Sequence, residues 1–546
     1  MPAETIILPV LLTRILRPLP RAVTRPAALA ILIAWPVQMG LLVRAVYLEQ
    51  PALAADLSRY GAGAQWKGVY YRGEKIGFMV GQTLPSEDGF DLTEDGRLQM
   101  VLLGATTAAR IHTSARVDKG FNLRSFSFAL DPGTGPIEIA GDLEGRRLHL
   151  TIKSAAGATR SETRELGETP SLALNLPRQL AAEGLRVGGT RTVSAFDPAT
   201  LRNAPMQLRV EGREVIWAAG KPVPAFRVKS TFQGLNATSW ITDVGEVLRE
   251  ESPMGLIVLR ETRERATALA VPGNLQLDML RTAAIQPSGP RIVDGTQLES
   301  LKVRLSGFAP DPLEVSGAGQ TLTGDVIEIV EPTAAAAVAA GPDVRRALQP
   351  EPLIESDAPE ILAEARKAVG DASAPHPKAE RLTRHVAALL EKRPTVSLPS
   401  ALEVLRTRVG DCNEHTALLV AMARAVGVPA RIAVGVVHVH GGFYYHAWPE
   451  VFIEGPPGRG YWLPVDPTLN QFPADPTHIV LARGGLDRQV AILPAIGQAR
   501  LEVLDLKRRS GTSNILVGRA QRDTRAIEIP LPRREGIAGC WSRPPE

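Results

Sequence analysis

Hydrophobic and polar positions alternate along the first half of the chain, from about residue 56 onward. A period of two is typical of antiparallel strands that bury one face, so we expect residues 56–270 to form a β-rich domain. A second, smaller β segment is expected over residues 271–331. The positions that carry this pattern are Arg124, Phe126, Phe128 and Leu130; Leu148, Leu150 and Ile152; Trp240 and Thr242, then Val247 and Arg249 after the Asp243-Val244-Gly245 turn; Leu301, Val303 and Leu305; and Val326, Glu328 and Val330.

The pattern changes after residue 331. Residues 332–358 are rich in alanine and proline without strand alternation, which indicates a linker with helical patches. Apolar residues then recur at helical spacing, at Ile361, Leu362 and Ala365 and again at Leu382, Val386, Leu389 and Leu390. Ser400 and Glu403 have capping-box spacing for a helix that Gly410 closes. We expect a domain over residues 359–485, followed by a C-terminal β extension and tail over residues 486–546.

One apolar run stands apart near the N-terminus. Residues 27–43 are apolar except for Gln38, and with their flanks they approach the roughly 20 residues that span a bilayer. Four arginines precede the run, which places the N-terminus in the cytoplasm. We therefore expect residues 1–55 to be a cytoplasmic N-terminus and single-pass inner-membrane anchor, with the rest on the periplasmic or extracytoplasmic side. The alternatives are a cleaved signal peptide, for which Ala52-Leu53-Ala54 supplies a small-x-small site, and a buried helix.

The amino-acid composition limits the classes of fold and function that remain. A chain of 546 residues exceeds one hydrophobic core, so several domains are expected. Its 62 lysines and arginines nearly balance 58 acidic residues without a dense basic run, which argues against nucleic-acid binding. Cys412 and Cys540 are the two cysteines, so no multi-disulfide framework exists. A lone cysteine inside a motif is better explained by reactivity, whereas Cys540 belongs to the tail.

The cysteine motif predicts a nucleophile at the start of a helix. Asp411 and Glu414 have capping-box spacing, so Cys412 opens a helix that ends near Gly427. The positive end of a helix dipole favours a thiolate, and its backbone N–H groups can receive charge that develops on a substrate oxygen. Both effects serve acyl transfer.

Two more candidate residues follow on strands. Residues 430–440 and 443–453 read as a hairpin with Gly441-Gly442 as its turn, which places His446 on the second strand. A third strand ends at Asp466. A cysteine, an imidazole and a carboxylate on consecutive elements can converge as nucleophile, general base and orienting acceptor.

The histidines of this hairpin also suggest a zinc site formed by His438, His440 and His446. With a two-residue turn, however, Val437 lies opposite His446. His446 then shares a face with Val437 and not with the other two histidines. We therefore expect neither a metal nor another cofactor.

Four segments resemble the transglutaminase-like superfamily in their order: Gly410-Asp411-Cys412, Gly427-Val428-Pro429-Ala430-Arg431, His446-Ala447-Trp448-Pro449-Glu450-Val451 and Val465-Asp466-Pro467-Thr468. The resemblance covers roughly residues 354–485 and implies a papain-like α+β fold. It also implies that Cys412 is the nucleophile, His446 the general base and acid, and Asp466 the residue that fixes the imidazole. The residues around Cys412 look like those of bacterial members, since no aromatic residue follows the cysteine as in animal crosslinking enzymes.

The expected function is a membrane-anchored thiol enzyme with a Cys-His-Asp catalytic triad, a cysteine protease or amidase that acts on peptide or protein amide bonds, with hydrolysis favoured over transfer to an amine. The competing hypothesis is a non-catalytic envelope scaffold that uses the same fold for binding. In either case the β-rich domain offers a surface for an envelope protein partner.

Overall fold

The computed structural model describes residues 59–509, apart from residues 62, 103–104, 134, 233, 253–254, 269–283, 308–314, 334–336, 395–397, 456, 485–491, 493–494 and 496–497. The predicted membrane anchor over residues 1–55 and the C-terminal tail with Cys540 lie outside these residues. In the described part of the chain, no helix is both long and apolar enough to cross a membrane. The described residues up to Arg508 belong to one compact unit.

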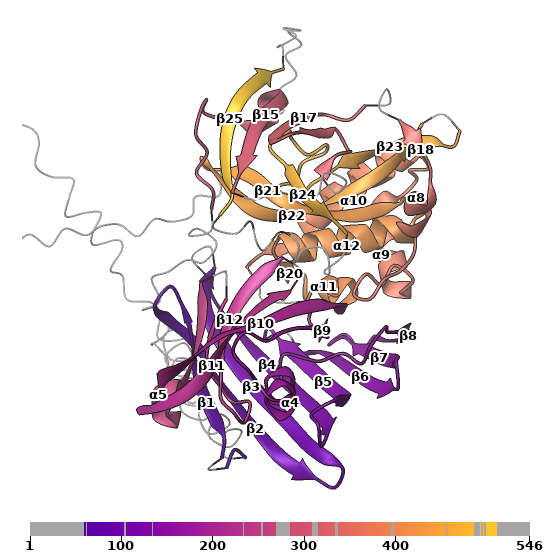
Figure 1. The fold of residues 1–546 in the computed structure, drawn as a ribbon. Helices are drawn as coiled ribbons and strands as arrows, with labels where there is room; N and C mark the ends of the chain where they lie inside the picture. The colour runs from indigo at the N-terminus through magenta and orange to yellow at the C-terminus, as the bar shows by residue number, and fades with distance from the viewer. Residues whose placement is uncertain are drawn as a thin grey trace, which may run out of the picture. The chain divides into compact units, whose positions relative to one another are not determined.

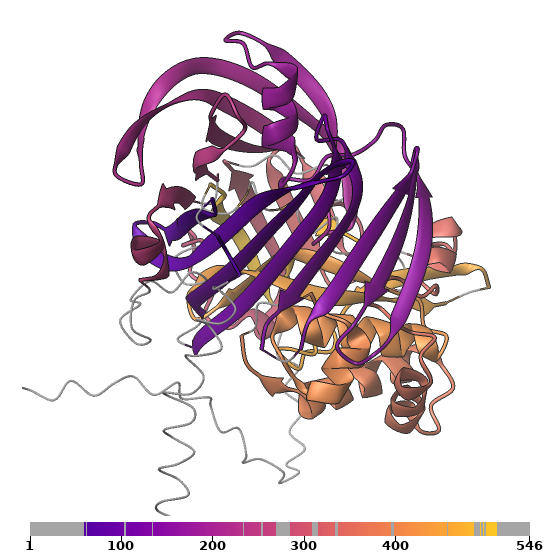
Figure 2. The same ribbon diagram turned by 90° about the horizontal axis from the view of Figure 1, so that it is seen from below.

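The middle region is rich in strands, as the alternation predicts. Fourteen antiparallel strands form one curved sheet in the order β8-β7-β6-β5-β4-β3-β2-β1-β14-β13-β12-β11-β10-β9 (Figures 1 and 2). Two runs of consecutive hairpins therefore meet where β1 pairs with β14. The strands are β1 (Gln65–Tyr71), β2 (Glu74–Ser86), β3 (Gly89–Leu102), β4 (Ala105–Asp118), β5 (Leu123–Asp131), β6 (Ile137–Glu144), β7 (Arg147–Lys153), β8 (Thr159–Glu165), β9 (Thr190–Asp197), β10 (Arg202–Ala218), β11 (Lys221–Phe232), β12 (Leu235–Ile241), β13 (Val247–Glu251) and β14 (Leu256–Glu261).

Most side chains that the alternation predicts to face the core of this sheet are buried. β5 buries Phe126, Phe128 and Leu130. Arg124, which was predicted on the same face, is exposed, and Leu123 is buried in its place, because the register with β4 shifts at this end of the strand. Leu148 and Leu150 of β7 are at most 1% exposed and join the same core. The hairpin predicted after Trp240 is confirmed, since β12 pairs with β13. Two short helices accompany the sheet, α4 (Leu176–Glu183) and α5 (Arg263–Thr267).

A separate four-stranded sheet follows in the order β16-β17-β15-β25. The strands predicted around Leu301 and around Glu328 are present, and the buried side chains of the second one are Ile327 and Ile329. The last strand of this sheet comes from the C-terminal extension. The elements are the 3-10 helix η2 (Gly295–Gln297), β15 (Leu298–Ser306), β16 (Gln320–Thr323), β17 (Val326–Val330) and β25 (Arg500–Arg508).

The α+β domain combines five helices with a five-stranded sheet in the order β18-β23-β22-β21-β24 (Figure 1). Most residues of α12 are buried, as expected for a helix surrounded by protein. It contacts α9, α10 and α11 together with β21 and β22. The elements are β18 (Val338–Ala339), α8 (Pro342–Arg346), α9 (Pro359–Val369), α10 (Pro375–Leu389), β19 (Glu391–Lys392), α11 (Ala401–Thr407), β20 (Val409–Gly410), α12 (Cys412–Ala425), β21 (Ala430–Val439), β22 (Gly442–Glu454), β23 (Arg459–Pro464) and β24 (Ile479–Arg483).

The predicted linker with helical patches, residues 332–358, holds the two-residue strand β18 and the short helix α8. Two local expectations in this region are wrong. α11 ends at Thr407, and Arg408, with a φ of 56°, closes the helix in place of the predicted Gly410. Gly410 instead belongs to the parallel pair of β19 and β20. The hairpin between β21 and β22 turns at His440-Gly441, where both residues have positive φ. This geometry matches a two-residue turn with the twist of the flanking strands.

Candidate active site

Cys412 is the first residue of α12, as the capping-box spacing predicts. The Asp411 carboxylate accepts the Asn413 N–H at 3.0 Å, and the Glu414 carboxylate accepts the Asp411 N–H at 2.8 Å. These bonds satisfy two backbone donors that the helix itself leaves open. The position before Asp411 is restricted to glycine, because a Cβ on Gly410 would lie 2.2 Å from the Glu414 Cβ. The helix start is therefore tightly specified.

The sulfur of Cys412 lies beside β22. It is partly exposed and accepts a hydrogen bond from the backbone N–H of Ala447, the residue that follows His446. Burial raises the pKa of the Cys412 thiol well above its ordinary value, and the nearby carboxylates of Asp411, Glu414 and Asp466 act in the same direction. Burial and these carboxylates thus act against the thiolate that the helix start was expected to stabilise.

His446 lies on β22 directly opposite Gly435 of β21. The predicted partner was Val437, so the turn correction moves the register by two residues. A shift of two leaves the facing unchanged, because side chains alternate with a period of two. His446 therefore lies on the opposite face of the hairpin from His438 and His440, and these three histidines do not converge.

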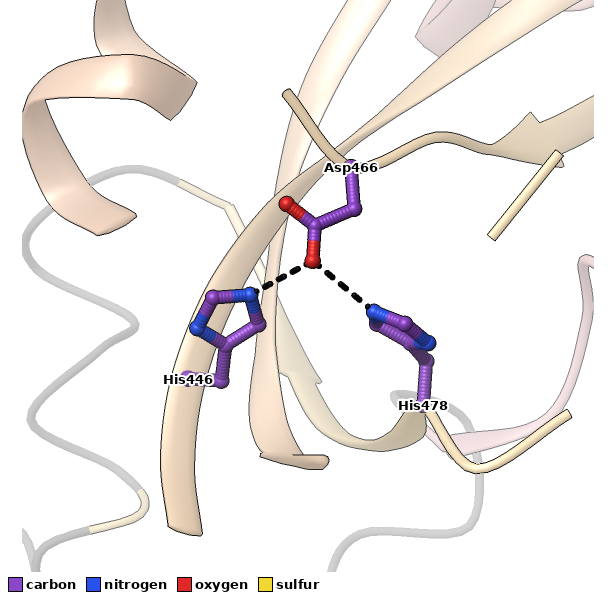
Figure 3. Close-up of side chains that lie close together, drawn as sticks. All are labelled: His446, Asp466 and His478. Atoms are coloured by element: carbon purple, nitrogen blue, oxygen red, sulfur yellow. Dashed lines mark hydrogen bonds and ion pairs between the residues drawn. The ribbon is translucent and has the colours of Figure 1, made fainter. Parts of the chain in front are cut away.

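Asp466 follows β23 and is fully buried. Its Oδ2 accepts a hydrogen bond from His446 Nε2 at 2.8 Å (Figure 3). Its Oδ1 accepts the backbone N–H groups of Thr468 at 2.7 Å and Leu469 at 2.9 Å. Burial alone would raise the pKa of Asp466, but His446 and His478 lower it strongly. The carboxylate is thus held ionised and oriented toward the imidazole of His446.

The structure therefore brings the three predicted residues into one region. His446 and Asp466 are hydrogen-bonded, and the Cys412 sulfur contacts the main chain immediately after His446. In this arrangement His446 Nε2 is engaged by the carboxylate, which leaves Nδ1 as the nitrogen available to exchange a proton.

His478 is a residue that the sequence analysis missed. It precedes β24, its side chain is 1% exposed, and its Nε2 donates to Asp466 Oδ2 at 3.0 Å (Figure 3). The ring packs against Trp448 at a centroid distance of 5.1 Å. Its one local signal is the Asp475-Pro476-Thr477-His478 turn, in which the Asp475 carboxylate accepts the Thr477 N–H at 2.9 Å. A turn of this kind carries no indication of a site.

His446, Asp466 and His478 are also the one group of metal-ligand side chains that converges within the described residues, with their ligand atoms within 4.8 Å of one another. Both imidazole Nε2 atoms, however, lie at hydrogen-bond distance from the same carboxylate oxygen. A hydrogen bond needs a proton on the nitrogen, whereas a metal needs its lone pair. The distances thus favour a hydrogen-bonded cluster.

Glu450 belongs to the same motif as His446 but faces a different set of partners. It is fully buried and forms ion pairs with Arg431 at 2.6 Å and Arg483 at 2.9 Å. Burial would raise the pKa of Glu450, but the two guanidinium groups lower it to about 2. This network joins β21, β22 and β24 and fixes the sheet on which His446 lies.

A cavity of about 510 Å³ lies next to the candidate residues. Asn413 and Ala447, each adjacent in sequence to a candidate residue, line one side of it. Arg164 and Arg202 of the fourteen-stranded sheet line another side. A volume of this size is typical of small-ligand sites, and the β-rich region supplies part of its wall.

Comparison with known proteins identifies the α+β region. Residues 363–467 match the family model of the transglutaminase-like superfamily. Two solved structures are similar to parts of the chain. One is a "Putative Cysteine Protease" from Cytophaga hutchinsonii, with 14% identity over 41% of this chain and 92% of that one and a TM-score of 0.24. The other is the periplasmic domain of TgpA from Pseudomonas aeruginosa bound to ethylmercury, with 17% identity over 33% of this chain and 93% of that one and a TM-score of 0.20. None of the curated proteins matches the sequence.

Proposed function

We propose, from the premise that residues 363–467 form a transglutaminase-like domain, that this chain is a thiol enzyme that transfers acyl groups from peptide or protein amide bonds. Cys412 is the nucleophile, His446 the general base and acid, and Asp466 the acceptor that orients His446. The observation that carries the proposal is the 2.8 Å hydrogen bond between His446 and Asp466, next to a cysteine at a helix start.

The raised pKa of Cys412 favours proton transfer during attack over a preformed thiolate. The Cys412 sulfur attacks the amide carbonyl carbon while its proton passes to His446 Nδ1. The tetrahedral intermediate collapses to a thioester as the amine leaves with the proton from His446. Water then attacks the thioester, with His446 taking one of its protons and returning it to the sulfur, so that an acid is released and the free thiol is restored.

An amine can take the place of water in the second half of the reaction. We favour hydrolysis, since both outcomes share the thioester and water is always present. Incubation with denatured casein and a fluorescent primary amine distinguishes them: hydrolysis generates new peptide N-termini, whereas transfer incorporates the dye into casein.

The role of the paired residues is tested by the rate at which iodoacetamide alkylates Cys412 between pH 5 and pH 10, with the Cys412 peptide followed by mass spectrometry because Cys540 is also a thiol. We expect His446→Ala to reduce the rate near pH 7 by roughly 10²-fold, within the usual range for general-base assistance. His438→Ala is the matched control, since this histidine lies on the opposite face of the hairpin. An unchanged rate and pH profile in His446→Ala would contradict the proposal and favour the non-catalytic scaffold.

We also propose that residues 1–55 anchor the chain in the inner membrane with the catalytic domain outside the cytoplasm. The apolar run after four arginines supports this orientation. Fractionation tests it: the chain is expected with the membranes, and protease added to spheroplasts should digest it. Recovery in the soluble periplasmic fraction without residues 1–54 would instead indicate a cleaved signal peptide.

A further inference from the structure

Asp466 is held by two imidazoles and not by one. Its Oδ2 accepts from His446 Nε2 at 2.8 Å and from His478 Nε2 at 3.0 Å, as Figure 3 shows. The two rings come from different sides, since His446 lies on β22 and His478 directly precedes β24. In a Cys-His-Asp site the second imidazole has no chemical step of its own to perform, so its position needs another explanation.

The far side of His478 is also occupied by an acceptor. His478 Nδ1 donates to the backbone oxygen of Asp475 at 3.0 Å, and the Asp475 carboxylate lies 3.5 Å away. That carboxylate is itself fixed by Thr477 and by Gln471 Nε2 at 2.8 Å. Both ring nitrogens of His478 therefore face oxygen acceptors, an arrangement that satisfies a doubly protonated imidazolium and no neutral tautomer.

Electrostatics agrees with this geometry. Burial by itself would lower the pKa of His478, but its hydrogen bonds and charge interactions with Asp466 and Asp475 raise the pKa to about 9. The titratable groups that face this ring are Asp466, Asp475 and, through the shared carboxylate, His446. Near neutral pH Asp466, His478 and Asp475 thus hold two carboxylates and one imidazolium.

We propose that His478, held by Asp475, is a positioning residue that keeps the Asp466 carboxylate ionised and directed at His446. The site then extends through five residues in a chain: Cys412, His446, Asp466, His478 and Asp475. This inference rests on the proposed function, because it assigns to His478 a role that acts through the proposed general base.

This series of five interacting residues explains how a carboxylate without solvent contact can take part in the reaction. One oxygen of Asp466 is fixed by backbone N–H groups and the other by two imidazoles, which leaves the carboxylate plane no freedom to rotate. The net charge of Asp466, His478 and Asp475 is −1. That charge matches the single positive charge His446 acquires when it accepts the proton of Cys412, so the buried group is neutral at the moment of attack.

The test measures alkylation of Cys412 in the full chain for His478→Gln and Asp475→Asn. His112→Gln is the matched control, because His112 also pairs with a carboxylate, Asp95 at 2.8 Å, but lies on the fourteen-stranded sheet. We expect His478→Gln to slow alkylation at pH 7 by roughly 10²-fold, the loss typical of a misplaced catalytic group. Asp475→Asn should cause a smaller loss, and His112→Gln none. If His478→Gln fails to fold, Asp475→Asn still tests whether Asp475 and His478 position Asp466.

The Asp466→Asn variant distinguishes a positioning role of His478 from a purely structural one. If His478 acts through Asp466, adding His478→Gln to Asp466→Asn changes the rate less than two-fold, because the target of its action is already lost. A full additional loss, or a loss equal to the fall in folded fraction measured by circular dichroism, would overturn the proposal.

Two further outcomes separate this inference from the function on which it rests. Loss of reactivity in His446→Ala with wild-type rates in His478→Gln would overturn the role of His478 alone, whereas unchanged rates in both variants would overturn the proposed function. Elemental analysis covers the metal alternative: zinc at one ion per purified chain that disappears in His478→Gln would replace the hydrogen-bonded chain by a metal site.

Discussion

At the scale of single residues, Gly435 shows how closely the strands around the site approach one another. It lies opposite His446, and a Cβ at this position would lie 1.9 Å from the backbone oxygen of Ile479. Because the obstacle is backbone, Gly435→Ala must push β24 away, and His478 precedes that strand. We expect a loss of about 1–3 kcal/mol in unfolding free energy together with slower alkylation of Cys412.

Urea denaturation measures the first effect and mass spectrometry the second. Gly455→Ala, in the turn between β22 and β23, is the control, since the nearest atom to its added Cβ lies 3.9 Å away. Equal stability of the two variants would show that β24 adjusts without cost.

Cys412, His446 and Asp466 could be located from the sequence because each follows a local signal. Capping residues flank the cysteine, strand alternation surrounds the histidine, and the aspartate ends a strand before proline. The structure places Cys412 at the predicted helix start and His446 on the predicted strand, whereas Asp466 lies two residues after β23 ends. His478 could not be found in this way, since its partner Asp466 is twelve residues away and only the tertiary fold buries the pair.

At the scale of elements, the start of α12 combines a stabilising cap with an unfavourable charge. Asp411 caps the helix, yet its carboxylate also raises the pKa of Cys412. Asp411→Asn keeps the capping oxygen and removes the charge, so we expect nearly unchanged stability and a lower pH midpoint for alkylation of Cys412. Asp411→Ala should lower the midpoint as well, but with a loss of about 0.5–2 kcal/mol. A midpoint that does not move in Asp411→Asn would show that the charge of Asp411 does not contribute to the raised pKa of the thiol.

The ion pairs of Glu450 predict how the stability of the fold depends on pH. The pKa of this carboxyl is lowered from 4.5 to about 2, so the folded state holds its proton less tightly than the unfolded chain. Its contribution to stability is therefore fully present above pH 4.5 and is lost as the pH falls toward 2. Glu450→Gln leaves two buried guanidinium groups facing a neutral amide, and we expect a loss of about 3–5 kcal/mol at pH 7.

Urea titrations at pH 7, 4 and 3 check this dependence. The difference between the wild-type chain and Glu450→Gln should shrink as the pH falls. The same difference at all three values would mean that the amide disrupts packing and that charge is not the cause. Glu454→Gln is a control at the end of the same strand, where the side chain is exposed.

Turns and helix ends were the least predictable elements. His440-Gly441 and Gly441-Gly442 are both acceptable two-residue turns by composition, and only the pairing of β21 with β22 decides between them. Gly410 reads as a helix terminator, but the parallel pair of β19 and β20 requires it in extended backbone. In each case a contact with a distant segment overrides the local preference.

At the scale of the whole molecule, the sequence pattern could not predict which distant strands pair with each other. Alternation predicts that strands exist but not which strands are neighbours. β15 pairs with β25 although about two hundred residues separate them, and β1 pairs with β14 in the same non-local manner. The C-terminal extension thus completes a sheet that begins before the transglutaminase-like domain.

This pairing predicts the effect of shortening the chain. Leu501 and Val503 of β25 are at most 2% exposed and pack in the same core as Leu301 and Val303 of β15. A chain that ends at residue 499 loses these two side chains, each worth about 1.5–3 kcal/mol of burial, and exposes β15 as an edge open to pairing between molecules. We expect a lower thermal midpoint and aggregation on size-exclusion chromatography.

The reference for this experiment is a chain that ends at residue 509, which keeps β25. Val503→Ala in that chain isolates the packing contribution, with an expected loss of about 1–3 kcal/mol for a truncated core side chain. If the chain ending at residue 499 is monomeric with the thermal midpoint of the reference, the α+β core does not depend on β25. Alkylation of Cys412 in both chains then shows whether the C-terminal strand also supports the site, since β15 and α12 contribute to one continuous core.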